Sequence, residues 1–182
     1  NHPPVHFMLL HLISSVFPGT VSVWFGCIIN LCTLVGICAC MMAGGKLLEK
    51  HGVLPEGFGR KWGILAAVFY GFSAGAVATT LLIRMYGLMT FCCVLTLYFH
   101  VKKWLEGSFD KKNKGLIAIT IIGFLTQYFF LFYCILLAVV TVVLLWTKKR
   151  IPELKRYIRS MIIAAVLGVC LFPFAIADVL SS

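Results

Sequence analysis

Arg84 and Tyr86 are the residues of this 182-residue chain whose chemistry stands out most clearly. Arg84 is the one charged residue in the apolar stretch 62–101. A guanidinium presents N–H donors in a fixed fork that fits phosphate oxygens, and Tyr86 adds a hydroxyl two residues further on. We therefore expect Arg84 and Tyr86 to bind a phosphate at the mouth of a cavity. The structural alternative is an arginine that reaches to the membrane surface along its own apolar stem.

Three histidines, His2, His6 and His11, crowd the start of the chain. His2 and His6 are four residues apart and would share one face of a helix, as a pair of zinc ligands does. The glutamate that follows the first histidine of a metalloprotease helix is missing here, and Pro3 disfavours helix at His2. His2 nevertheless stays a candidate metal ligand, and a divalent metal ion is the one cofactor that the sequence suggests. We expect His6 and His11 to be packing residues.

Gln127 and Tyr128 interrupt a second apolar stretch, residues 116–146. Two interpretations stay open for them. They satisfy a hydrogen bond between helices, which is common inside membrane bundles, or they contact the polar head group of a substrate.

Carboxylates are missing near these candidates. Glu49, Glu56, Glu106, Asp110 and Glu153 fall in polar loops, and Asp178 lies close to the last residue. No carboxylate is well placed as a general base beside Arg84. The eight cysteines all lie in apolar runs without the spacing of a zinc site, so we interpret them as small apolar residues.

The composition indicates an integral membrane protein. Hydrophobic residues make up 61% of the chain and charged residues only 12%, whereas soluble domains are about 45–50% apolar. The net charge of +10 is carried by short basic clusters between long apolar runs. This pattern is typical of membrane-protein loops, and it argues against nucleic acid as a partner.

The apolar runs predict an all-α, polytopic helical bundle with about six spans, forming a single transmembrane domain over residues 1–182. Residues 5–17 rise only about 20 Å as a helix and fit a short helix at the membrane interface. The expected spans are 21–44, 62–83, 85–101, two halves of 116–146 that meet near Thr126–Gln127, and 161–177. The short halves require a polar joint below the membrane surface, lining a protein cavity.

The basic residues predict the orientation. Every Lys and Arg except Arg84 lies in loops 45–61, 102–115 and 147–160, and the positive-inside rule places such loops in the cytoplasm. An even number of crossings between neighbouring loops then requires two spans in 62–101 and two in 116–146. The N-terminal segment, the Arg84 joint, the Gln127 joint and Asp178 fall on the outer side of a multi-pass protein of the cell membrane.

Three strings in order resemble a known family. Residues 2–12 (HPPVHFMLLHL), 84–88 (RMYGL) and 123–130 (GFLTQYFF) are similar to the HPPLYYLLLHLW, RMYAL and GLLTHYYF strings of bacterial family-39-type membrane glycosyltransferases. These are relatives of the protein mannosyltransferases and the lipid A aminoarabinose transferases, with the GT-C fold. The resemblance covers essentially the whole chain as the N-terminal and central part of a longer enzyme.

The resemblance implies transfer of a sugar from a polyprenyl-phosphate-linked donor to an acceptor on the outer face of the membrane. It places the catalytic aspartate upstream of residue 2, so we expect the first span, the first outer loop and a C-terminal part to lie outside these 182 residues and the fragment alone to be inactive. It places His2 near the donor or a metal, Arg84 and Tyr86 at the donor phosphate, and Gln127 and Tyr128 along the cavity.

Two positions depart from the family pattern. The acid that often stands two residues before the family's arginine is Leu82 here, and the histidine of its THY string is Gln127. Both changes weaken a metal or acid–base role at these positions, whereas phosphate binding by Arg84 survives them.

Two other classes of function stay open. A transporter or flippase-like protein for a lipid-linked or anionic substrate also uses broken helices with polar joints, and it predicts an inverted internal repeat. A membrane scaffold without catalysis predicts that Arg84 can be replaced without consequence. The sugar and the acceptor are not specified by any of these patterns.

Overall fold

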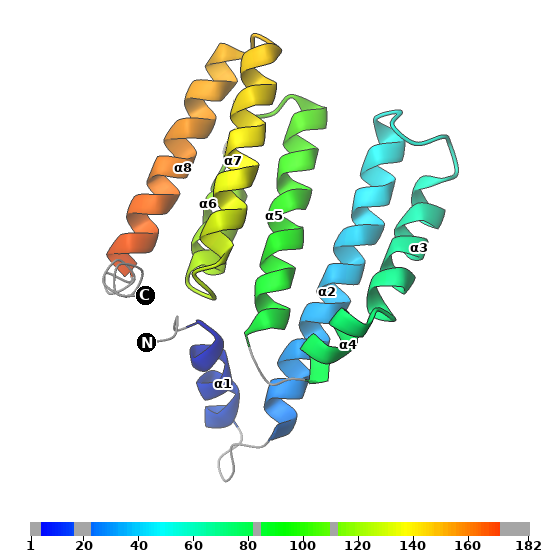
Figure 1. The fold of residues 1–182 in the computed structure, drawn as a ribbon, viewed down its shortest axis with the longest axis vertical. Helices are drawn as coiled ribbons and strands as arrows, with labels where there is room; N and C mark the ends of the chain where they lie inside the picture. The colour runs from blue at the N-terminus through cyan, green and yellow to red at the C-terminus, as the bar shows by residue number, and fades with distance from the viewer. Residues whose placement is uncertain (1–4, 17–22, 82–84, 110–112, 172–182) are drawn as a thin grey trace. The chain divides into compact units, whose positions relative to one another are not determined.

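The computed structural model describes residues 5–16, 23–81, 85–109 and 113–171, and all of their regular secondary structure is helical. Figure 1 shows the eight helices. They are α1 (Val5–Val16), α2 (Val23–Lys50), α3 (Gly59–Gly71), α4 (Ala74–Leu81), α5 (Tyr86–Glu106), α6 (Lys114–Phe124), α7 (Phe130–Thr147) and α8 (Ile151–Leu171). The prediction of an all-α chain is confirmed for these residues.

The chain divides into two compact units. The N-terminal unit contains residues 5–98, with α1 to α4 and the first part of α5. The C-terminal unit contains residues 99–182 together with 1–4, and its described helices are the end of α5, then α6, α7 and α8.

Among the described residues, two helices are long and apolar enough to cross a membrane. They are α2, from Trp24 to Lys50, and α7, and the pair α3–α4 makes a third if a bent pair counts as one span. Exposed apolar side chains cover one face of α7, among them Phe132, Leu136 and Val139 at 69%, 64% and 56%. Exposure of such an apolar face to water is unfavourable, whereas lipid chains can cover it.

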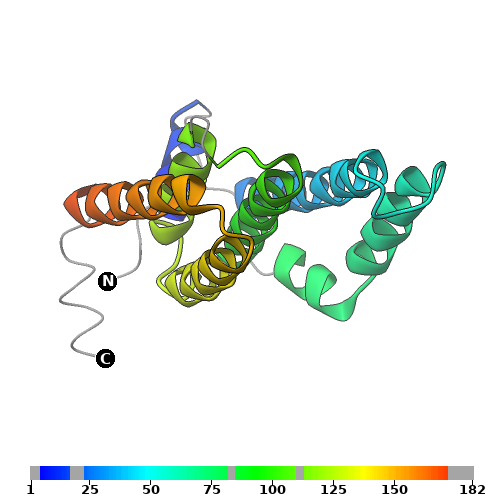
Figure 2. The same ribbon diagram turned by 90° about the horizontal axis from the view of Figure 1, so that it is seen from above.

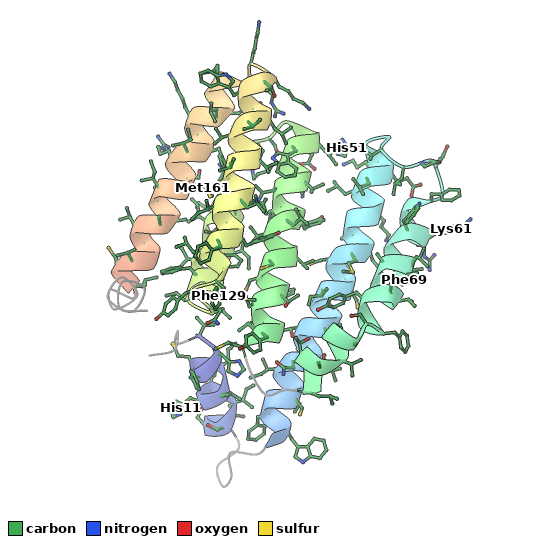
Figure 3. All side chains as sticks on the ribbon, viewed as in Figure 1. His11, His51, Lys61, Phe69, Phe129 and Met161 are labelled. Atoms are coloured by element: carbon green, nitrogen blue, oxygen red, sulfur yellow. The ribbon has the colours of Figure 1, made fainter. Side chains whose placement is uncertain are left out.

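Close contact between α2 and α3 depends on glycine. A Cβ added at Gly45 would lie 2.2 Å from the carbonyl oxygen of Gly59, and one at Gly63 would lie 2.7 Å from the Cα of Met42. Gly59 and Gly63 are four residues apart on one face of α3, the small-xxx-small spacing by which membrane helices approach closely. In Figure 3, Lys61 and Phe69 project from α3 away from this contact.

The apolar stretch 62–83 was expected to be one span, but two helices form it. α3 and α4 meet at a bend of 61°, which the second view shows clearly (Figure 2). The Ser73 hydroxyl donates to the carbonyl of Tyr70 (2.7 Å) and accepts from the N–H of Ala76 (3.2 Å). One side chain thus satisfies the end of α3 and caps the start of α4, which stabilises the break.

The three polar loops are shorter in the structure than the sequence suggested. α2 continues to Lys50, so only residues 51–58 connect it to α3, and α8 begins at Ile151, directly after a short turn. Lys and Arg are good helix formers, so a helix that leaves the apolar layer continues through them. Charge therefore marks where a helix leaves the membrane better than where it ends.

The second apolar stretch breaks where the sequence predicted. α6 ends at Phe124 and α7 begins at Phe130, with Thr126 and Gln127 between them. The N–H groups of Thr126 and Gln127 both donate to the carbonyl of Gly123, at 3.1 and 3.2 Å. Gly123 has no room for a side chain, because a Cβ there would lie 2.4 Å from the Phe130 ring.

Candidate functional site

The two predicted joints differ in how much of each the structure describes. His2 and Arg84 lie outside the described residues, whereas Tyr86, Gln127 and Tyr128 lie within them. Tyr86 is half-buried at the first residue of α5, in the N-terminal unit. Gln127 and Tyr128 are brought together in the α6–α7 joint of the C-terminal unit.

Asn30 of α2 fixes the chain just before the Arg84 segment. Its side chain is only 1% exposed, and its amide nitrogen lies 3.2 Å from the carbonyl oxygen of Thr79 and 3.3 Å from that of Thr80. These carbonyls belong to the last turn of α4, where carbonyl groups have no partner within the helix. An amide from a neighbouring helix therefore supplies the C-terminal cap of α4.

Asn30 also packs against the chain just after that segment. A Cβ on Gly87 would lie 3.1 Å from the Thr33 hydroxyl oxygen and 3.2 Å from the Asn30 amide oxygen. The first turn of α5 therefore rests directly on this polar patch of α2. Residues 82–84 are thus flanked on both sides by backbone that Asn30 contacts.

Sequence reasoning missed Asn30, although a signal was present. It is the only Asn, Gln, His or charged residue in the predicted span 21–44. Polar side chains inside membrane helices usually face a partner helix and hydrogen-bond to it.

The Gln127 joint is buried within its own unit. The Gln127 side chain is 8% exposed, and Thr126 is fully buried with its hydroxyl donating to the carbonyl of Ile122 at 2.8 Å. The Tyr128 ring is tilted against Phe124, with 6.4 Å between the ring centroids. Phe129, in contrast, is 67% exposed (Figure 3). A buried amide at a helix break is expected to hydrogen-bond to a neighbouring helix or to a ligand.

A second buried cluster lies at the other end of the C-terminal unit, and no sequence pattern pointed to it. His100 Nε2 and the Tyr157 hydroxyl are 3.1 Å apart, and the Phe109 ring packs edge-on against Tyr157. The cluster anchors the segment after α5.

This anchoring explains how α6 can be so short. Its 11 residues rise about 16 Å. Asn113, just before α6, donates from its amide to the Ser160 hydroxyl at 2.9 Å, and Ser160 lies about 14 Å along α8 from Ile151. Phe109 and Asn113 are buried, so the chain enters the unit before the helix begins.

The carboxylates of the described residues have structural roles or lie exposed. Glu49 accepts the N–H of Gly57 at 2.6 Å and of Gly59 at 2.7 Å, at the start of α3. Glu153 pairs with Arg150 and accepts the N–H of Phe109. Glu56 and Glu106 are exposed. Within the described ranges no three His, Cys, Asp or Glu residues gather as a metal site, and the candidate ligand His2 lies outside them.

Comparison with known proteins adds no family to this description. No family model, no curated protein and no solved structure matches the chain. The three strings and the geometry at the two joints are therefore what a functional assignment has to rest on.

Proposed function

We propose that the chain is the membrane part of a GT-C-type glycosyltransferase, which moves a sugar from a polyprenyl-phosphate-linked donor to an acceptor on the outer face of the cell membrane. The observation that carries the proposal is the contact of Asn30 with both flanks of the segment that contains Arg84. A buried amide that contacts the chain on both sides of Arg84 suits a site in which one guanidinium must be held toward a ligand.

The depth of Asn30 supports an outer site. Asn30 lies about 24 Å along α2 from Lys46, the first basic residue at the other end of that helix. The hydrocarbon layer of a bilayer is about 30 Å thick. If the basic end lies at the cytoplasmic surface, the anchored joint lies a little below the outer one. That depth suits the junction between a lipid tail and its phosphate.

The chemistry assigns a role to each candidate residue. Transfer breaks the bond between the sugar's anomeric carbon and the phosphate oxygen of the donor, and it forms a bond from that carbon to the acceptor oxygen. Arg84, helped by Tyr86, stabilises the negative charge that grows on the departing lipid phosphate. The family resemblance gives Gln127 and Tyr128 the role of contacting the sugar.

The proton of the acceptor needs a carboxylate. Since Glu49 and Glu153 are held by structural partners, the proposal places the general base on the aspartate that the family resemblance puts before residue 2. His2 would hold a divalent metal ion beside that aspartate, if the full enzyme uses one.

The proposed topology has six crossings formed by α2, the bent pair α3–α4, α5, α6, α7 and α8, with α1 at the interface. α5 and α8 carry basic residues at the ends that face loops 102–115 and 147–160, which suits helices that leave the membrane on the basic side. α6 is short for a crossing, and the buried residues Phe109 and Asn113 before it add to its depth.

The bent pair α3–α4 also favours a transporter or flippase for a lipid-linked or anionic substrate, because broken helices bind substrates in such proteins. The two functions differ in their product. A transferase forms a new glycosidic bond, whereas a flippase moves an intact donor across the bilayer.

The test supplies membranes containing the full-length protein with a panel of radiolabelled polyprenyl-phosphate sugars. The proposal predicts that label from at least one donor moves to an acceptor that no longer carries the lipid. Translocation of an intact donor without transfer would replace the proposal by the flippase. If neither transfer nor translocation occurs with any donor, a membrane scaffold without catalysis is the function that remains.

A further inference from the structure

The end of the C-terminal unit between α7 and α8 carries a dense group of basic residues. We define the basic turn as Lys148, Lys149, Lys155 and Arg159, all of which are exposed. Lys155 and Arg159 are one turn apart on the same face of α8. The opposite face of α8 packs into the unit through buried residues such as Leu154 and Tyr157. The charges are therefore held outward by a buried helix face.

Glu153, the one acidic residue between Lys148 and Arg159, does not neutralise the basic turn. Glu153 is engaged by Arg150, whose Nε and Nη2 atoms lie 2.6 and 2.5 Å from its two oxygens. The same carboxylate accepts the N–H of Phe109 at 3.2 Å. The charges of Arg150 and Glu153 cancel each other, and the positive charges of the basic turn face outward.

Lys149 stands where glycine is usual. Its φ is +54°, and the N–H of Arg150 donates to the carbonyl of Leu145 at 2.9 Å, the bond that closes a helix through a left-handed residue. Glycine would adopt this conformation without strain. A lysine here departs from the preference for glycine at a left-handed position. Its side chain is exposed, so packing does not offset the backbone strain. Departures of this kind without a compensating gain point to function.

The surroundings of the basic turn are apolar. Trp146 is 66% exposed and Ile151 39%, and they flank the turn at the end of the candidate span α7. Tryptophan with Lys and Arg is typical of the level of lipid head groups. A partner for this surface has to offer negative charge next to hydrocarbon.

We infer that the basic turn binds the head groups of anionic phospholipids in the leaflet where α7 ends. Lipid phosphates accept charge-assisted hydrogen bonds from Lys and Arg, and the lipid chains cover Trp146 and the exposed face of α7. The inference requires α7 to be inserted in a bilayer and does not depend on sugar transfer. Each basic residue near a negatively charged membrane surface raises binding about fivefold.

The experiment places the full-length protein in nanodiscs that contain phosphatidylcholine and phosphatidylglycerol in equal amounts. Native mass spectrometry then counts the lipids of each kind that stay bound after the protein is released from the nanodisc. The test variant replaces Lys148, Lys149, Lys155 and Arg159 by Gln. The matched control replaces Lys46, Lys50, Arg60 and Lys61 by Gln, which removes the same charge from the N-terminal unit.

The wild-type protein is expected to retain phosphatidylglycerol over phosphatidylcholine. The preference for phosphatidylglycerol should fall at least tenfold in the test variant and clearly less in the control. An unchanged preference in the test variant, or an equal loss in both variants, would overturn the inference. The second outcome would mean that net charge alone attracts the lipid.

A single substitution keeps the test valid if the fourfold variant fails to fold. Lys149→Gly relieves the left-handed residue and removes one charge, so the helix end stays intact while the preference for phosphatidylglycerol falls about fivefold. A preference that is unchanged in Lys149→Gly would contradict the inference. An acidic protein that binds the basic turn when phosphatidylglycerol does not would also overturn it.

Discussion

Asn30 is the residue whose position gives the proposed site its geometry. Its amide reaches the last turn of α4, and Gly87 at the start of α5 packs on it. The one amide side chain of this apolar span thus contacts two other helices. Arg84 is the chemical candidate between these two contacts in the sequence, and the proposed function makes Asn30 its positioning residue.

Replacing Asn30 by Ala should lower the free energy of unfolding by about 1 kcal/mol, because two carbonyls lose their donor in an apolar environment. Thr90→Val is the matched control, since the Thr90 hydroxyl bonds only within α5, to the carbonyl of Tyr86 at 2.9 Å. Thermal unfolding in detergent measures both variants. Equal midpoints for Asn30→Ala and the wild type would show that the amide does not anchor the joint.

For single residues, the sequence predicts those that stand at a helix break better than those that support it from another helix. Gln127 was predicted at a break and lies at one. Asn30, His100 and Tyr157 were missed because their partners are distant in the chain. Asn30 bonds to Thr79 and Thr80, and His100 lies against Tyr157. No local spacing encodes such pairs.

Helix contacts in the N-terminal unit depend on backbone approach and less on side-chain volume. At Gly45 the backbone of α3 is so near that a Cβ has no space, whereas the neighbouring Gly44 has nothing within 4 Å of its Cβ position. The two glycines are adjacent in the sequence and differ only in the face of α2 that they occupy.

Gly45→Ala should therefore destabilise the protein by about 1–3 kcal/mol, because a methyl group would push α3 away from α2. Gly44→Ala should be neutral or slightly stabilising, since alanine favours helix over glycine. Unfolding of both variants in detergent makes the comparison. The α2–α3 arrangement would be wrong if Gly44→Ala lost as much stability as Gly45→Ala.

Helix boundaries were predicted well where the polypeptide itself carries the signal. The break at Gln127 follows from polar residues inside an apolar run. The break at Ser73 was missed, because a serine and a glycine are common in membrane helices and the apolar stretch 62–83 reads as continuous. Its cause is the hydroxyl that caps α4, which becomes visible only with the backbone in place.

For the molecule as a whole, the membrane character is carried by α2, α7 and the bent pair α3–α4. The all-α class followed from the composition together with the lengths of the apolar runs. The number of crossings stays a prediction, because α5 and α8 mix apolar and basic residues and α6 is short. Charge counting orders the loops on one side, but only labelling can test that order.

The proposed topology predicts the sidedness of three positions. Cysteines introduced at Lys50 and Lys148 should react with an impermeant maleimide only after the membrane is permeabilised, because both belong to basic loops. A cysteine at Trp24, at the other end of α2, should react in intact cells. The wild-type chain gives the background of its own cysteines. Reaction of Lys50→Cys and Lys148→Cys from opposite sides would refute six crossings.

The central claim is that Arg84 binds the phosphate of a lipid-linked sugar donor. The most direct measurement compares sugar transfer by the full-length wild type, Arg84→Lys and Arg84→Ala, with equal amounts of inserted protein. Loss of one preorganised charge-stabilising donor lowers turnover about 10²–10³-fold in other enzymes. We predict a loss of that size for Arg84→Ala and a partial loss for Arg84→Lys, which keeps the charge but not the fork. Wild-type transfer by Arg84→Ala would contradict the claim and leave Arg84 as a residue that only reaches the membrane surface.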